Sequence, residues 1–211
     1  MLLIKPRYLF LVITILLSNS VYSESSFFHK IKLIHGMSVD VPTHWRILSQ
    51  ATRKNLNAAG QSMMDNSDIE RSNGRKKTLL AMNALPRPAG AMLRISVTLP
   101  PDYTQDDLNS VTKGELKEIE AELLKTFKKL ESSGGPKVIK MQPVRIEEFG
   151  DYNVLVMSYV RAGLNGPSPW QVTQYKIPVS DKLIELTLSY RKSDSIVWIP
   201  ILERVKRSLI F

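Results

Sequence analysis

The chain has 211 residues, no cysteine, 29 Lys and Arg against 20 Asp and Glu, and a formal net charge of +9. Without Cys there can be no disulfide, no thiol nucleophile, no thiolate metal site and no lipid anchor on a cysteine. The length is sufficient for one domain with a sizeable core, and no internal repeat or long linker divides the chain.

The N-terminus has the three parts of a signal peptide. Two basic residues precede the apolar run Tyr8–Leu17, and small residues precede a cleavage site after Ser23. The run is too short for a bilayer span of about 20 residues. An uncleaved N-terminal anchor is the alternative. We therefore expect residues 1–23 to be a signal peptide. Residues 24–211 should form one domain that is soluble in the periplasm or secreted, with no later transmembrane segment.

The charge of the mature chain narrows the class of partner. Loss of Lys5 and Arg7 with the signal peptide would leave a net charge of +7. Such a balance favours acidic partners, such as anionic lipid, lipopolysaccharide or an acidic protein. Nucleic acid is not expected as a partner outside the cytoplasm.

A pair of short strands is predicted at the start of the domain. Apolar residues alternate around 31–33 and 37–41, and a short His-Gly connection separates the two runs. Pro42 lacks an amide donor, so the second strand should end there or lie at a sheet edge. We expect Trp45 to fold back over the open end of the core.

A modest helix and a polar loop are predicted next. Ser49 or Thr52 is a suitable N-cap for a helix that extends to about Met63. The stretch 65–77 that follows is polar, and we expect its tip to be the most mobile part of the mature protein.

The densest basic cluster of the chain, Arg75-Lys76-Lys77, lies at the end of this loop. Asn73-Gly74 directly before it is a strong signal for a two-residue hairpin turn. We favour a solvated turn over a binding patch for the three side chains. They remain candidate partner contacts because loops carry recognition.

Two strands and a long helix are predicted for the centre of the chain. Residues 77–85 and 92–99 have the composition of strands joined by a turn. A long helix should run over Gln105–Ser132, with Thr104 and Asp107 as a capping pair and an apolar stripe along one side. We expect this stripe to pack against the sheet rather than to bind a partner.

The C-terminal third is predicted to be a meander followed by a helix. The helix should begin at a cap formed by Ser193 or Asp194, with Pro200 in its first turn or at a kink. Its buried face is expected to consist of Ile199, Leu202, Val205 and Leu209. The connections between the strands of the meander are short, so the strands should be antiparallel neighbours. The predicted strands are 138–148, 153–161, 169–179 and 182–191.

The order of these elements resembles a known family. The N-terminal strand pair ends in "DVPTHW" (40–45), and the terminal helix contains "VKRSL" (205–209). With the central hairpin, the long helix and the meander, this order resembles the PsbP-like α/β/α sandwich family, which includes bacterial exported relatives of the DcrB type. The resemblance covers most of the mature chain. It implies an α+β fold, in which helices flank both faces of an antiparallel sheet, and a helper or binding protein rather than an enzyme.

No motif in the sequence indicates catalysis or a cofactor. The G-x-S-x-G, P-loop and Gly-rich dinucleotide signatures are absent. The histidines, His29, His35 and His44, match no common zinc spacing. Adjacent acidic pairs, such as 106–107 and 147–148, diverge on a helix or a strand. We therefore expect no catalytic residue, no metal and no cofactor.

Three functional hypotheses follow. The leading one is an exported periplasmic accessory or binding protein that acts through surface contacts, with another envelope protein or an anionic surface as its partner. A binder of anionic membranes or lipopolysaccharide is one alternative, and an enzyme with an unrecognised site is the other. Oligomeric state stays open. For Trp170, packing beneath the turn 163–170 is favoured over exposure. The candidate contacts are the sheet edge, Arg75, Lys76, Lys77 and Trp170.

Overall fold

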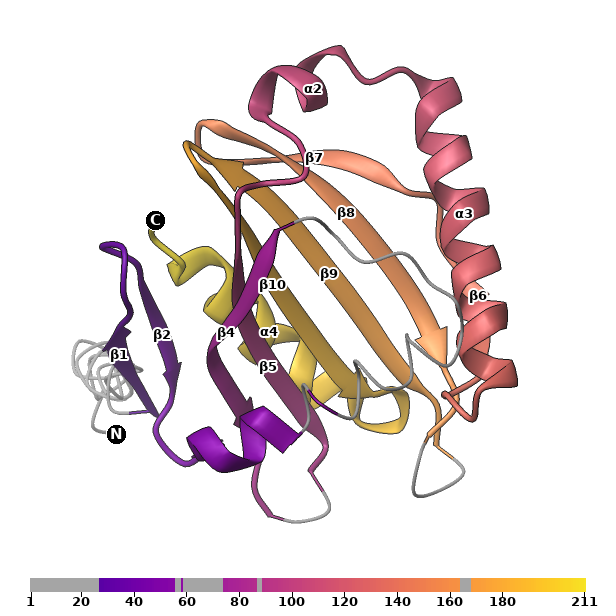
Figure 1. The fold of residues 1–211 in the computed structure, drawn as a ribbon. Coiled ribbons are helices and arrows are strands. Elements are labelled where there is room, and N and C mark those ends of the chain that lie inside the picture. Colours follow the sequence, from indigo (N-terminus) through magenta and orange to yellow (C-terminus); the bar gives the residue numbers. More distant parts are fainter. Residues whose placement is uncertain (1–26, 56–57, 59–73, 87–88, 164–167) are drawn as a thin grey trace, which may run out of the picture.

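An antiparallel sheet of eight strands forms the centre of the computed structural model, which describes residues 27–55, 58, 74–86, 89–163 and 168–211 (Figure 1). The strand order is β3-β4-β5-β10-β9-β8-β6, and β7 also pairs with β8. The predicted signal peptide lies outside the described residues. The strands are β3 (Arg46–Ile47), β4 (Arg75–Asn83), β5 (Ala91–Leu99), β6 (Val138–Met141), β7 (Arg145–Phe149), β8 (Tyr152–Arg161), β9 (Trp170–Val179) and β10 (Lys182–Arg191).

A separate two-stranded hairpin precedes this sheet. Strands β1 (Phe28–Lys32) and β2 (Ser38–Pro42) pair antiparallel, and the turn between them places His35 and Gly36 at φ values of 62° and 74°. Glycine adopts this left-handed conformation without a steric penalty, which explains the tight connection. The prediction of two short strands that end at Pro42 is confirmed.

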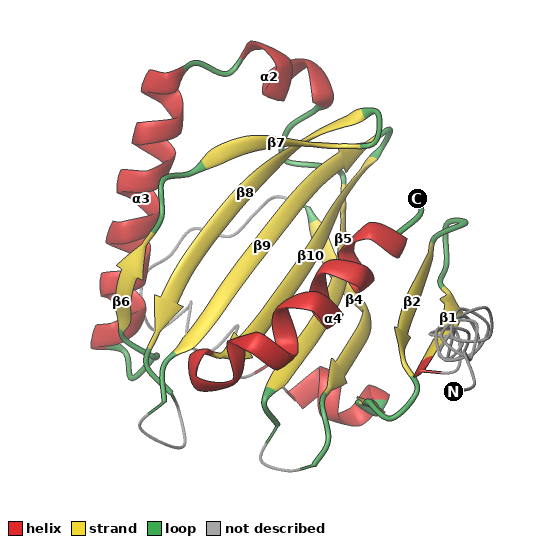
Figure 2. Ribbon diagram, turned by 180° about the vertical axis from the view of Figure 1, so that it is seen from behind, coloured by secondary structure: helices red, strands yellow, loops and turns green. Residues whose placement is uncertain are grey.

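The terminal helix α4 (Ser195–Ser208) lies across one face of the main sheet (Figure 2). Leu202, Val205 and Leu209 are buried there against alternate residues of the strands, such as Val154 and Val156 of β8. The hairpin closes the side of this core, because the amide of Asp40 donates to the hydroxyl of Ser208 at 2.9 Å. Three buried residues of the predicted helix stripe are therefore confirmed.

A second, smaller core lies on the opposite face of the sheet. Leu155 and Met157 alternate with the residues that face α4, so they point to the other side. Partly buried residues of helix α3 (Lys113–Ser132) pack against this cluster, together with Leu108 of helix α2 (Gln105–Ser110). Helices thus flank both faces of an antiparallel sheet, as the α+β sandwich prediction requires.

The prediction of one long central helix is wrong in one respect. The segment forms two helices, α2 and α3, with a break at Val111 and Thr112. The predicted capping pair is confirmed at the start of α2, where the amide of Asp107 donates to the Thr104 hydroxyl at 3.3 Å. Thr112 begins a second capping box with Glu115. A capping box stabilises a helix start, so α3 begins anew at Thr112.

One strand and two residues of α4 also differ from the prediction. The single strand expected over 138–148 is split into β6 and β7, and both pair with β8. Pro143 lies in the gap, where a residue without an amide donor cannot continue the ladder. In α4, Ile199 is exposed rather than buried. Pro200 lies beyond the first turn, so the first of the two alternatives predicted for it is wrong. Among the described residues, no helix has the length and apolar character needed to cross a membrane.

Candidate functional site

The outer edge of the main sheet is only partly covered. Strand β3 pairs with β4 at Met82 and Asn83, and the Leu48 amide after it donates to the Ala81 carbonyl at 2.8 Å. The described strands therefore leave the N-terminal half of β4 without a neighbour on this side. The pairing of β4 with β5 shifts register between Thr78 and Leu80, which marks a β-bulge at Leu79. Bulges locally disturb a ladder, and they are common at sheet edges and functional sites.

Arg53 occupies part of this edge. Its Nη1 atom donates to the Leu79 carbonyl at 2.7 Å, while its Nε atom is buried and has no hydrogen-bond partner in the described structure. Residues 50–55 are helical, and Ser49 caps them, since its hydroxyl accepts from the Thr52 amide at 3.2 Å. The Ser49 cap is confirmed. Most of the predicted extension towards Met63 lies outside the described residues.

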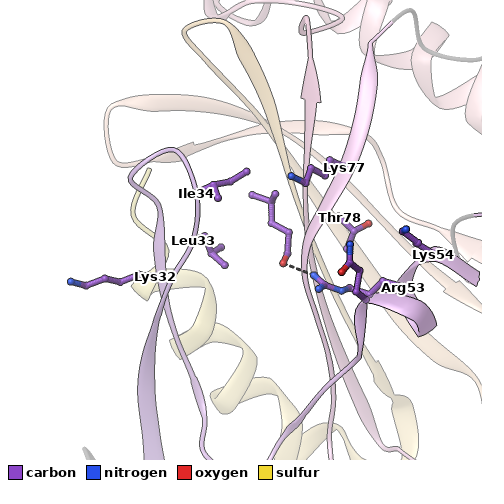
Figure 3. A pocket seen from close by; sticks show the side chains of 9 residues that line it. Lys32, Leu33, Ile34, Arg53, Lys54, Lys77 and Thr78 are labelled. Atoms are coloured by element: carbon purple, nitrogen blue, oxygen red, sulfur yellow. Dashed lines mark hydrogen bonds between the residues drawn. The ribbon is translucent and has the colours of Figure 1, made fainter.

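A pocket of about 510 Å³ opens between the hairpin, the 50–55 helical segment and β4 (Figure 3). Four of its lining residues are basic and none is acidic. A concave site lined by one sign of charge concentrates ions of the opposite sign. We call it the basic pocket, and its cationic residues are Lys32, Arg53, Lys54 and Lys77.

The cationic side chains are directed differently around the basic pocket. Lys77 extends from β4 towards Ile34 of the hairpin, and Arg53 points at β4 (Figure 3). Lys32 extends away from the pocket, so it contributes to the wall near its backbone. Lys77 is exposed and has no ion-pair partner among the described residues. The geometry makes Lys77 the ammonium group best placed to meet an anionic group in the pocket.

The predicted turn at Arg75-Lys76-Lys77 is wrong, because all three residues belong to strand β4. Successive strand residues point to opposite faces. Lys76 therefore points away from the basic pocket, where its Nζ atom lies 2.7 Å from the carboxylate of Glu185 on β10. Arg75 and Lys77 share the other face. Asn73 lies outside the described residues, so the predicted two-residue turn does as well.

Trp170 lies at the opposite end of the sheet from these residues. It is the first residue of β9, half-buried, and it pairs with Arg161 of β8 and Arg191 of β10. The guanidinium of Arg161 lies 5.5 Å from the centroid of its ring, a cation–π distance. The pKa of Arg161 is lowered, chiefly because the guanidinium is partly buried, and the neighbouring Tyr159 offsets part of this effect. The structure does not bring Trp170 together with the basic cluster.

The histidines are separate from one another and from the basic pocket. His29, His35 and His44 are exposed, and they lie on β1, in the hairpin turn and after β2. In the part of the chain that the structure describes, no group of three or more acidic or histidine side chains is arranged to hold a metal ion.

Sequence reasoning missed most of the basic pocket. Lys32, Arg53 and Lys77 come from three elements that are far apart in the chain, and no spacing rule connects them. The sequence analysis named Lys77 and a sheet edge as candidate contacts. It did not name the pocket residues that come from the hairpin and the 50–55 segment.

Comparisons with known proteins find similarity at the level of fold. No protein-family model and no curated protein matches the sequence. The solution structure of cyanobacterial PsbP (CyanoP) from Synechocystis sp. PCC 6803 is 13% identical, with a TM-score of 0.55, and the match covers 92% of this chain and 98% of that one. At this identity the likeness shows the fold, and it confirms the PsbP-like sandwich.

Two further solved structures are more distant. LpqN, involved in cell envelope biogenesis of Mycobacterium tuberculosis, is 12% identical with a TM-score of 0.44, over 86% of this chain and 90% of that one. A structure from Bacteroides thetaiotaomicron is 11% identical with a TM-score of 0.43, over 82% of this chain and 44% of that one. This chain therefore spans less than half of the Bacteroides structure.

Proposed function

We propose that the protein is an exported accessory or binding protein of the bacterial envelope that acts through surface contacts and without catalysis. The basic pocket is its contact site, and an acidic segment of another envelope protein is its partner. The observation that carries this proposal is the lining of the pocket, which combines four basic residues with no acidic one. The PsbP-like fold and the signal-peptide pattern agree with a helper protein outside the cytoplasm.

The charges around the pocket distinguish it from the rest of the surface. Several lysines elsewhere have acidic neighbours, such as Lys182 with Asp181 at 3.1 Å and Lys206 with Glu203 at 3.3 Å. Lys77 has no such neighbour in the described structure. Opposite charges near a cationic group reduce the field it presents to a ligand. The positive electrostatic field of the basic pocket is therefore not reduced by an acidic neighbour of Lys77 in the described structure.

The backbone adds a second means of recognition. The Arg75–Leu79 part of β4 pairs with β5 on its inner side and has no strand on its outer side among the described elements. Its outer backbone groups therefore lie next to the lysine side chains. An extended peptide can add to such an edge while its side chains enter neighbouring pockets. An acidic extended segment would form hydrogen bonds with the unpaired backbone groups of β4 and place its carboxylates near the lysine side chains.

Site-specific cross-linking in the producing cell tests the proposal. Ile34 lines the basic pocket and is exposed, so a photo-reactive amino acid in its place should capture a bound envelope protein. The same amino acid at Ile139, exposed on β6, is the control for nonspecific capture. We expect a discrete cross-linked product from position 34 and none from position 139.

A charge variant completes the test. Lys77→Gln should reduce the product from position 34 at least severalfold, because it removes the ammonium group that faces the pocket. Lys76→Gln, a neighbour on the opposite face of β4, should leave the product unchanged. Equal products from positions 34 and 139, or a product that survives Lys77→Gln, would contradict a partner site in the basic pocket.

A further inference from the structure

The first half of helix α4 is apolar on all sides. Residues 196–202 are seven consecutive apolar residues, although only one side of the helix packs on the sheet. A helix that covers a core from one side needs apolar residues on that side alone. The remainder is exposed, and Ile196, Val197 and Ile199 retain 89%, 51% and 45% of their accessible surface.

The exposed apolar surface continues onto the hairpin. Val197 and Ile201 are four residues apart and therefore share one side of α4. Ile201 lines a small hollow of about 230 Å³ with Phe27, Phe28 and Pro42 from the hairpin. We call this surface the α4 outer face, and it consists of Ile196, Val197, Ile199, Ile201 and Phe27.

Basic groups flank the α4 outer face at both ends. Four basic and two acidic residues lie between Lys192 and the C-terminus. Both acidic residues have basic neighbours, because Asp194 lies 3.5 Å from Arg191 and Glu203 lies 3.3 Å from Lys206. The positive charges that flank the face are Lys192, Arg204 and Arg207.

We propose that the α4 outer face docks on the surface of a bilayer that carries anionic phospholipids. The helix would lie in the plane of the interface, with its apolar side chains at the level of the headgroups and its arginines on lipid phosphates. Amphipathic helices with basic residues bind anionic membranes in this way, through buried apolar area and electrostatic attraction together.

Charge and shape both favour lipid over a protein as the occupant. The face carries positive charge without an unneutralised acidic residue, which is complementary to anionic headgroups. Its crest is a single convex helix, and Ile196 protrudes almost fully into solvent. A planar lipid interface accommodates a protruding helix, with its apolar side chains at the level of the headgroups.

This docking surface is separate from the basic pocket. Phe27 of the α4 outer face directly precedes β1, and the hollow beside it reaches Pro42 at the end of β2, whereas the hairpin residues of the basic pocket lie at and beyond the end of β1. A protein held at the membrane surface by α4 would leave its pocket open to a partner. The two proposals can therefore fail independently.

Vesicle binding by the full-length protein isolated from the envelope tests the inference. The probes are vesicles of phosphatidylglycerol with phosphatidylcholine, and vesicles of phosphatidylcholine alone, with flotation as the readout. We expect binding to the anionic vesicles and at least about tenfold weaker binding to the neutral ones. Ile196→Asp together with Val197→Asp should weaken anionic binding at least tenfold, because two apolar anchors are replaced by charges that lipid repels.

The matched control is Ile139→Asp, at a position that is 56% exposed on β6. It should leave vesicle binding unchanged, and all variants should keep the wild-type melting temperature within a few degrees. Arg207→Glu should weaken anionic binding, while Lys117→Glu on α3 should not.

Three outcomes would overturn the inference. The first is failure of the wild-type protein to float with anionic vesicles, and the second is binding that survives the double Asp substitution. In the third, sedimentation velocity would show a dimer that the double substitution dissociates, which would make a second copy the occupant of the face.

Discussion

Trp45 and Trp198 meet edge to face, with ring centroids 5.9 Å apart and planes inclined by 74°. The contact joins the segment after the N-terminal hairpin to the terminal helix, so the two ends of the described chain close one core. Gly90 also lies against the Trp198 indole, where an added Cβ would come within 2.8 Å of the ring. The Trp198 ring therefore contacts two segments that are distant in the chain, at Trp45 and at Gly90.

Trp45→Ala should lower the free energy of unfolding by about 3–5 kcal/mol, because it removes a large buried side chain and leaves a cavity. The urea midpoint measures this loss. Trp45→Phe should retain more of the stability, since the indole N–H of Trp45 has no hydrogen-bond partner in the described structure. An unchanged midpoint in Trp45→Ala would show that the ring does not close the core.

Gly90→Ala should destabilise the protein by about 1–3 kcal/mol through overpacking against Trp198. Gly114→Ala is the matched control, because the nearest neighbour of its Cβ would lie 3.6 Å away, in the first turn of α3. There alanine should stabilise by up to about 1 kcal/mol. Thermal melts of both variants measure the two effects, and equal shifts in one direction would contradict the close approach.

Thr112→Ala should raise the pKa of Glu115 towards its ordinary value. The amide and the hydroxyl of Thr112 donate to one Glu115 carboxylate oxygen at 2.7 and 2.8 Å, and both bonds lower the pKa of this group. A lowered pKa in the folded state contributes stability that is present above the unfolded pKa and is lost as the pH falls through the folded one. NMR titration of the Glu115 carboxyl should show the rise, and thermal melts of Thr112→Ala should depend less on pH in this range.

Replacing Lys77 should lower the melting temperature by only a few degrees while weakening capture of an envelope partner. Replacing Trp170, which lies at the opposite end of the sheet from the basic pocket, should also lower the melting temperature by only a few degrees and should leave capture unchanged. Lys77 is exposed, and Trp170 is only half-buried. A loss of 1 kcal/mol shifts the melting temperature of a domain of this size by about 2–4 °C. A pull-down from the envelope fraction, together with a melt of each variant, tests this. Capture lost only by variants that also unfold would show that these residues are structural.

The protein from the envelope should begin at or near Glu24, because the signal peptide is expected to be cleaved after Ser23. Intact-mass spectrometry of the native protein measures the start. A chain that retains Met1 in the membrane fraction would instead support the uncleaved anchor.

Local patterns predicted the elements that one stretch of sequence determines. The hairpin up to Pro42, the last three strands of the meander and the Thr104 cap all follow from alternation, short connections or a single capping motif. The start of α3 was missed although its signal was present, since Thr112 and Glu115 repeat the spacing of Thr104 and Asp107. The continuous apolar stripe obscured the second cap.

The site depended on tertiary pairing that no local pattern contains. Asn73-Gly74 favoured a turn at the basic cluster, whereas the pairing of β4 with β5 begins at Arg75. That pairing separates Lys76 from Lys77 by face, and Arg53 joins the pocket only because its guanidinium reaches the Leu79 carbonyl. Only the three-dimensional arrangement shows which basic residues line the same pocket.

The Arg53 contact with the bulge at Leu79 also bears on the solubility of the protein. An unpaired strand edge is a template for intermolecular sheet growth and hence for aggregation. Here a side chain from another element occupies one edge carbonyl, a bulge interrupts the ladder, and lysines with like charge line the same strand. These are the devices by which natural sheets prevent the addition of a further molecule.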